Sequence, residues 1–124
     1  MSSPKKNVTF IESVKYAWDG VRIAYSEERN LRSHVYSTII IFILGYLFSF
    51  NIDDFLWLTL VCFIVIFSEL LNTLVENIVD LVTDQYHPLA KKIKDIAAGT
   101  VLISSFFAVI MGIFLFLPKI LSLF

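Results

Sequence analysis

The sequence predicts an all-α membrane protein in which one amphipathic helix precedes three transmembrane helices. Hydrophobic residues occupy 57% of the 124 positions and charged residues only 17%, with a mean hydropathy of +0.77. An ordinary soluble domain has about 25% charged residues. Uncharged runs occupy positions 35–52, 55–68 and 96–118, and the total length fits a single domain.

Residues 8–28 have the spacing of an amphipathic helix. Apolar side chains recur every three or four positions along one stripe, and Asp19 and Arg22 lie off that stripe. Because the segment is too polar to cross a bilayer, we expect it to lie in the membrane interface, with Trp18 and Tyr25 at headgroup level.

Three apolar segments follow the amphipathic one. We expect the first span at 31–52 and the second at 55–83, where the helical pattern continues beyond the uncharged run. Since a span needs only about 20 residues, the second helix should project into the cytoplasm. Pro88 suits the first turn of a new helix, which predicts the third span at 89–118, and Pro118 should end it.

The distribution of basic residues predicts the orientation of the chain. Six precede the first span, none lies between the first and second, three lie between the second and third, and one follows the third. By the positive-inside rule, the N-terminus is cytoplasmic and the C-terminus is outside. The residues counted are Lys5, Lys6, Lys15, Arg22, Arg29, Arg32, Lys91, Lys92, Lys94 and Lys119.

The composition also excludes several kinds of site. Cys62 is the single cysteine, which excludes an internal disulfide and a structural metal site of the thiolate type. The four glycines are scattered, so we expect no glycine-rich phosphate loop. The net charge of −1 by itself says little about partners, because the distribution of charge matters more than its sum. No nucleic-acid partner is expected.

Four polar side chains should form a seam along the second span. At about 100° per residue, Glu69, Asn72, Glu76 and Asp80 share an arc of roughly 80° on an otherwise apolar helix. If the span begins near Phe55 at the outer face, Glu69 lies about 21 Å further along, roughly 9 Å short of the cytoplasmic edge of the hydrocarbon core. Glu76 then lies close to that edge, and Asp80 lies in the headgroup or aqueous zone.

The seam has three possible interpretations. Carboxylates on one arc repel one another and need a cation; hard oxygen ligands suit Mg²⁺, which usually brings phosphate with it. Alternatively, the seam holds helices together through hydrogen bonds. A third interpretation is an ion or proton pathway, although in the outer half, 55–67, only Thr59 and Cys62 are polar.

Other polar groups could converge on the same region. Lys94 and Asp95 open the third helix on the cytoplasmic side, where a cation could hold phosphate. Glu28 lies at the cytoplasmic edge of the first helix, at the right depth for a metal ligand. His87 precedes Pro88 and is expected to contact headgroups or phosphate from a turn.

At these residues the sequence resembles a known family. The run Glu69-Leu-Leu-Asn72-Thr-Leu-Val-Glu76-Asn-Ile-Val-Asp80, with Lys94-Asp95 after it, is similar to the signature of the small bacterial integral-membrane lipid kinases. That family contains diacylglycerol kinase and undecaprenol kinase. The resemblance is nearer to the undecaprenol kinase branch of Gram-positive bacteria. The segments that favour this branch include Glu28-Arg29-Asn30, Asp80-Leu-Val-Thr-Asp84, His87-Pro88-Leu-Ala-Lys91 and Phe116-Leu-Pro118-Lys119.

The resemblance implies a homotrimer in the bacterial cytoplasmic membrane, with composite active sites shared between neighbouring subunits. It implies ATP as phosphoryl donor and Mg²⁺ as cofactor. Glu69 would be the general base, Glu28 and Glu76 would hold the metal, and Asn72 and Asp80 would complete the polar seam. The residues implied to contact nucleotide are Tyr16, Glu28, Glu76, Gln85, Tyr86, His87, Lys94 and Asp95. Those implied to lie on the lipid side are Arg22, Arg32, Glu69 and Ala98.

The function expected from the sequence is therefore that of an ATP-dependent lipid kinase. It would transfer the γ-phosphoryl group to the hydroxyl of a lipid alcohol, which the branch resemblance suggests is undecaprenol. Phosphorylation of diacylglycerol is the nearest alternative, and a small ion-conducting protein is the alternative from another class.

Overall fold

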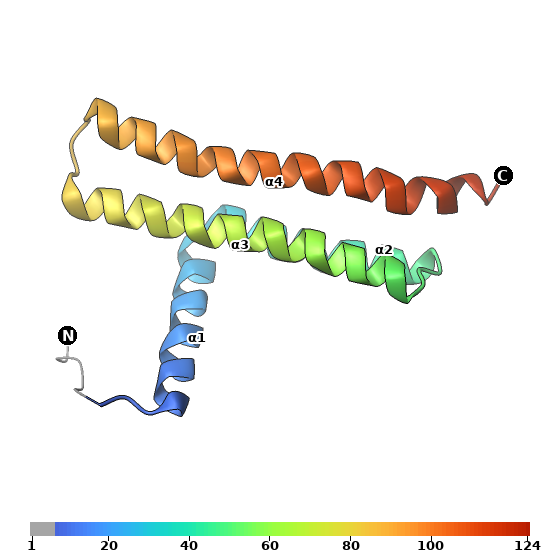
Figure 1. Cartoon of the computed structure of the whole chain (residues 1–124), viewed down its shortest axis with the longest axis horizontal. Helices are drawn as coiled ribbons and strands as arrows, with labels where there is room; N and C mark the ends of the chain where they lie inside the picture. The colour runs from blue at the N-terminus through green and yellow to red at the C-terminus, as the bar shows by residue number, and fades with distance from the viewer. Residues whose placement is uncertain (1–6) are drawn as a thin grey trace.

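The computed structural model describes residues 7–124, and within that range the chain forms four helices and no strand. The all-helical fold is therefore confirmed (Figure 1). Lys5 and Lys6, which the predicted orientation counts, lie outside the described residues. The helices are α1 (Phe10–Glu27), α2 (Arg29–Leu47), α3 (Ile52–Val82) and α4 (Pro88–Leu121).

The helices α2, α3 and α4 run side by side, and α1 leaves them at a steep angle (Figure 1). The most extensive packing is between α3 and α4, and α2 packs on α3 over a smaller area. The paired ends of α3 and α4 extend past the junction of α1 with α2. With the spans crossing a bilayer, this geometry suits an α1 that lies along the interface and an α3–α4 hairpin that projects beyond it.

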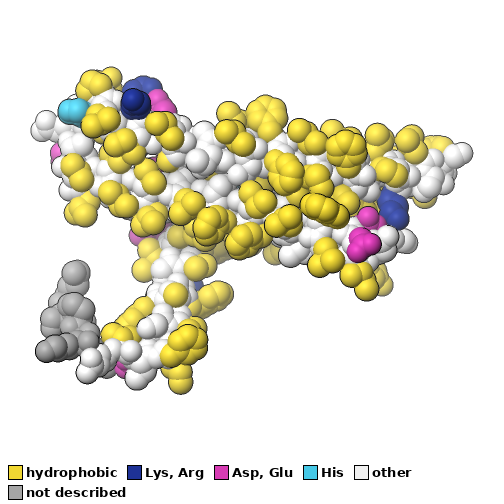
Figure 2. Space-filling view, viewed as in Figure 1, with side chains coloured by type: hydrophobic (Ala, Val, Ile, Leu, Met, Phe, Trp, Pro, Cys, Tyr) yellow, Lys and Arg dark blue, Asp and Glu magenta, His cyan; other side chains and the backbone are white. Residues whose placement is uncertain are grey.

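Apolar side chains cover most of the α3–α4 pair on the face shown in Figure 2, and charged side chains gather towards its two ends. Within residues 7–124, α3 and α4 are long and apolar enough to cross a membrane. The same test does not select α2, whose first turns carry Arg29, Arg32 and His34. Its 19 residues give it a length of about 28 Å, close to the thickness of the hydrocarbon core. That α2 also crosses the membrane stays a prediction.

The helix α2 ends at Leu47, five residues before the predicted limit of 52. It ends in a Schellman motif, in which the Phe50 amide donates to Gly45 O at 3.0 Å and the Ser49 amide donates to Tyr46 O at 3.1 Å. Ser49 has a φ of 57°, in the left-handed region that usually selects glycine or asparagine. Because position 49 carries neither glycine nor asparagine, the sequence contained no signal for a helix end at this residue.

Replacing Ser49 by glycine should stabilise the protein. Glycine adopts the left-handed conformation without the Cβ clash, so we expect a gain of about 0.5–1 kcal/mol in the free energy of unfolding. Thermal unfolding in detergent measures the change. Ser49→Ala is the matched control, since it removes the hydroxyl and keeps the Cβ. An equal gain from both variants would show that backbone conformation is not the cause.

Local capping explains where α3 and α4 begin. Asn51 Oδ1 accepts from the Asp54 amide at 2.8 Å, and Asp54 Oδ2 accepts from the Asn51 amide at 3.1 Å, so α3 begins at Ile52 rather than at 55. His87 Nδ1 accepts from the Leu89 amide at 3.1 Å, and Pro88 occupies the first helical position as expected.

Pro118 does not end α4, contrary to the sequence-based expectation. The proline lacks one donor, but its carbonyl still accepts from the Ser122 amide at 3.1 Å, so one further turn forms to Leu121. Lys119 in that turn lies 3.7 Å from the Asp54 carboxylate, which ties the last turn of α4 to the first turn of α3.

Candidate functional site

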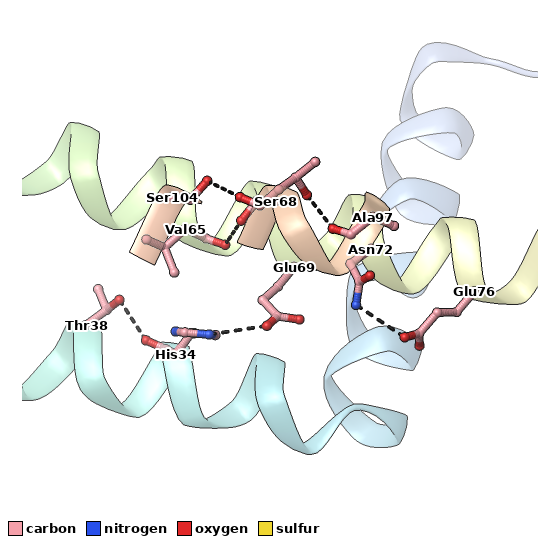
Figure 3. Close-up of polar contacts among 10 residues, drawn as sticks. His34, Thr38, Val65, Ser68, Glu69, Asn72, Glu76, Ala97 and Ser104 are labelled. Carbon is pink, nitrogen blue, oxygen red and sulfur yellow. Dashed lines mark hydrogen bonds and ion pairs between the residues drawn. The ribbon is translucent and has the colours of Figure 1, made fainter. Parts of the chain in front are cut away.

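Glu69 lies buried on α3, facing α2 (Figure 3). Its side chain is only 4% exposed, and its Oε1 lies 3.3 Å from Nε2 of His34 on α2. A carboxylate removed from solvent at this depth is costly unless a partner compensates it. The structure supplies that partner from His34, a residue of the predicted first span at 31–52.

One turn further along α3, Asn72 continues the polar seam. Its Nδ2 donates to Glu76 Oε1 at 3.4 Å (Figure 3). Asn72 Oδ1 and the neighbouring Thr73 Oγ1 are both buried without a hydrogen-bond partner among the described residues. Buried polar atoms without partners are uncommon and cost free energy, which suggests that a bound group or a second subunit satisfies them.

The junction of α1 with α2 lies close to this seam. Glu28 is half-buried at the junction, and its charge acts on Glu69, as does that of Glu76. Arg32 points back from α2, and its Nη1 donates to the carbonyls of Tyr25 and Ser26 at 2.9 Å each. A cation at these free carbonyls stabilises the C-terminus of α1 and so holds Glu28 at the junction.

The Tyr25 hydroxyl is also hydrogen bonded to the Tyr36 hydroxyl at 2.8 Å, with the two rings edge to face. This bond raises the pKa of Tyr25 above its ordinary value. The contact fixes the end of α1 against α2, because both tyrosines would have to give up a ring contact and a hydrogen bond for α1 to swing away.

A charged pocket lies where α3 turns into α4. Lys94 Nζ on α4 lies 2.7 Å from Asp80 Oδ1 on α3, and Lys91 pairs with Asp95 one turn away. These side chains surround a pocket of about 290 Å³. The predicted nucleotide and seam residues that line it are Asp80, Gln85, Tyr86, His87, Lys94 and Asp95.

Three predicted site residues do not join these groups within one chain. Tyr16 and Arg22 are exposed on α1, where Arg22 lies 3.7 Å from Asp19, and Ala98 is exposed on α4. No group of three or more His, Cys, Asp or Glu side chains in the range 7–124 is arranged to hold a metal ion.

His34 is the site residue that sequence reasoning missed. Between His34 and the end of α2 at Leu47, the ionisable residues are Tyr36 and Tyr46. The place of His34 inside the predicted first span, 31–52, did not single it out as a site residue. Its contact with Glu69 depends on the register between α2 and α3, which hydropathy and helical period within one segment do not determine.

The comparisons with known proteins agree on one family. The family model for prokaryotic diacylglycerol kinase matches residues 15–116. A diacylglycerol kinase of Synechocystis is 42% identical over 112 residues, which are 90% of this chain but only 64% of that protein. An undecaprenol kinase of Bacillus subtilis is 37% identical over 111 residues, 90% of each chain. A diacylglycerol kinase of Helicobacter pylori is 38% identical over 104 residues.

The family match covers the amphipathic helix, the buried seam and the charged pocket together. The family and the apolar helices suggest a membrane protein, and the kinase family implies ATP as phosphoryl donor and a lipid as acceptor. The chain belongs to the prokaryotic diacylglycerol kinase family and is a lipid kinase.

Proposed function

We propose that this protein phosphorylates undecaprenol, transferring the γ-phosphoryl group of ATP to the lipid hydroxyl. The observation that carries the proposal is the buried Glu69, which lies on the same helix as the charged pocket at the α3–α4 turn. The Bacillus subtilis undecaprenol kinase supports the choice of lipid, because the match covers 90% of both chains.

Two zones of α3, one at Glu69 and one at Glu76, take different parts in the reaction. Glu69 accepts the proton of the lipid hydroxyl inside the inner leaflet, where a chain alcohol can reach it. Glu76 lies seven residues further along, about 10 Å, which is close enough for the polyphosphate of ATP to bridge the gap. Phosphoryl transfer needs an oriented nucleophile and neutralised phosphate charge more than covalent help, and this division provides both.

The remaining roles are those that the family resemblance implies. Lys94, Asp95 and the 85–87 turn contact the nucleotide from the charged pocket. Tyr16 contacts it from a neighbouring subunit. Arg22, Arg32 and Ala98 lie on the lipid side. Asn72 orients Glu76 through its amide hydrogen bond.

The donor set fits Mg²⁺. This ion is commonly held by one or two carboxylates together with substrate phosphates and water, so a site with two protein carboxylates is sufficient. Glu28 and Glu76 are the proposed ligands, and both act electrostatically on the same buried region. Bound Mg²⁺ would neutralise charge that develops on the transferred phosphoryl group.

A homotrimer with composite sites would bring the separated residues together. Tyr16, Arg22 and Ala98 are exposed in the single chain, where a neighbouring subunit or the membrane can cover them. The unpartnered oxygens of Asn72 and Thr73 support the same assembly. We place the N-terminus and the α3–α4 turn in the cytoplasm and the C-terminus outside, in a bacterial cytoplasmic membrane.

Diacylglycerol is the second candidate substrate, because the Synechocystis relative is a diacylglycerol kinase and is 42% identical. The ion-pathway alternative loses its support, since the chain belongs to a family of lipid kinases. Both lipids offer a primary hydroxyl to the same reaction, but one carries it on a prenyl chain and the other on a glycerol with two acyl esters, so the choice between them needs a direct comparison.

The purified protein should transfer labelled phosphate from Mg-ATP to undecaprenol with the higher kcat/KM when each lipid is offered in separate micelles. Incorporation of label into extracted lipid measures both reactions, with a micelle that lacks any lipid alcohol as the control. Preference for diacylglycerol would overturn the choice of substrate. No transfer to either lipid would overturn the proposed function as a whole.

A further inference from the structure

The burial of Glu69 creates a problem that a general base must solve in every turnover. The base receives a proton from the lipid hydroxyl and has to release it before the next lipid arrives. With its side chain only 4% exposed, Glu69 has little direct access to water. The proton therefore needs a second group through which it can leave.

His34 is placed to accept that proton. Its Nε2 lies 3.3 Å from Glu69 Oε1, within reach for a proton to pass between them with a small side-chain movement (Figure 3). The His34 side chain is 28% exposed, seven times the exposed fraction of Glu69. Imidazole is also the side chain best suited to gain and lose a proton near neutral pH.

A cavity adjoins His34, and most of the residues that line it are apolar. This cavity, between α2, α3 and α4, has a volume of about 110 Å³, and Ser37 and Thr38 line it beside His34. A water molecule needs roughly 10–15 Å³ of such volume and a few polar partners. The Thr38 hydroxyl donates its hydrogen bond to the His34 backbone carbonyl at 2.8 Å and not to a nitrogen of the imidazole ring.

We propose that His34 is a proton-relay residue that returns Glu69 to its carboxylate form after each phosphoryl transfer. The inference rests on the proposed role of Glu69 as base. As the lipid oxygen bonds to phosphorus, its O–H bond breaks and the proton moves to Glu69. The Glu69 O–H bond then breaks as an Nε2–H bond forms on His34, and the imidazolium releases its Nδ1 proton to water. Exchange with water restores the starting tautomer.

Other charged groups face the same carboxylate without taking this role. Glu28 at the α1–α2 junction and Glu76 on α3 act on Glu69 through their negative charge. Both are assigned above to the metal, whereas the imidazole Nε2 of His34 lies 3.3 Å from Glu69 Oε1.

Replacing His34 by glutamine tests the relay, because the amide can still hydrogen bond to Glu69 but cannot carry a proton. We expect kcat to fall about 10- to 100-fold, with the KM values for lipid and Mg-ATP changed less than about three-fold. In His34→Ala, added imidazole should restore a substantial part of the lost kcat, in proportion to the concentration of the free base. Thr59→Val, in the outer half of α3 and outside this cavity, is the matched control and should keep the wild-type kcat, because its hydroxyl donates to the Phe55 carbonyl of its own helix.

Two outcomes would overturn the relay. One is a wild-type kcat in His34→Gln, and the other is a loss of activity in His34→Ala that imidazole does not restore, which would indicate a structural role. Glu69→Gln, measured in parallel, separates this inference from the function on which it rests. If Glu69→Gln retains activity, Glu69 is not the base and both proposals fail. If Glu69→Gln is inactive while His34→Gln is fully active, only the relay fails.

Discussion

Glu69→Gln should lower kcat for lipid phosphorylation by about 10²–10⁴-fold, the range that general-base catalysis contributes. The amide has the shape of the carboxylate and can still contact His34, but it cannot accept the proton of the lipid hydroxyl. We expect the KM for Mg-ATP to stay within about three-fold, because the nucleotide pocket lies further along α3. Initial rates of labelled phosphate incorporation into undecaprenol measure the change.

Ser68→Ala is the matched control for this variant. Ser68 precedes Glu69 on α3 and is also buried, but its hydroxyl donates to the Val65 carbonyl at 2.8 Å within its own helix. Its loss should leave kcat near the wild-type value. A Glu69→Gln protein with more than a tenth of wild-type activity would contradict the assignment of Glu69 as the base.

Glu76→Gln should lower kcat/KM for Mg-ATP by about 10²–10³-fold, since it removes the charge of a proposed metal ligand. The Mg²⁺ concentration that gives half-maximal activity should rise, and added Mg²⁺ should recover part of the loss. The glutamine oxygen can still accept from Asn72 Nδ2, so the fold of α3 should be retained. Activity measured against Mg²⁺ concentration at fixed ATP gives both quantities.

Asn77→Ala serves as the control for that variant. Asn77 is the next residue on α3, is exposed, and carries no charge. It should change neither the Mg²⁺ dependence nor kcat/KM by more than about two-fold, in line with a surface change that touches no ligand. If Glu76→Gln showed the Mg²⁺ dependence of the wild type, Glu76 would not be a metal ligand.

The features of this protein that could be read from sequence are those that lie within one helix. The spacing of Asn72 and Glu76 places them on adjacent turns, and in the structure the two side chains are in contact. Long apolar runs likewise identified α3 and α4 as helices able to cross a membrane. Both inferences use local periodicity, which the chain carries residue by residue.

The features that could not be read depend on contacts between helices or on single backbone angles. The pairing of His34 with Glu69 follows from the register of α2 on α3, and that of Lys94 with Asp80 from the hairpin of α3 and α4. The end of α2 depends on Ser49 adopting a left-handed conformation that its residue type does not favour. Tertiary packing decides each of these, and a single sequence does not encode it in a local pattern.

The central claim is that one helix carries a lipid-alcohol zone at Glu69 and a separate metal–nucleotide zone at Glu76. Calorimetric titration of a non-hydrolysable Mg-ATP analogue into the wild-type, Glu69→Gln and Glu76→Gln proteins tests it most directly. Glu69→Gln should bind the analogue with wild-type affinity, and Glu76→Gln should bind it at least about tenfold more weakly. Equal losses of affinity in both variants, or none in Glu76→Gln, would contradict the division of the helix into two zones.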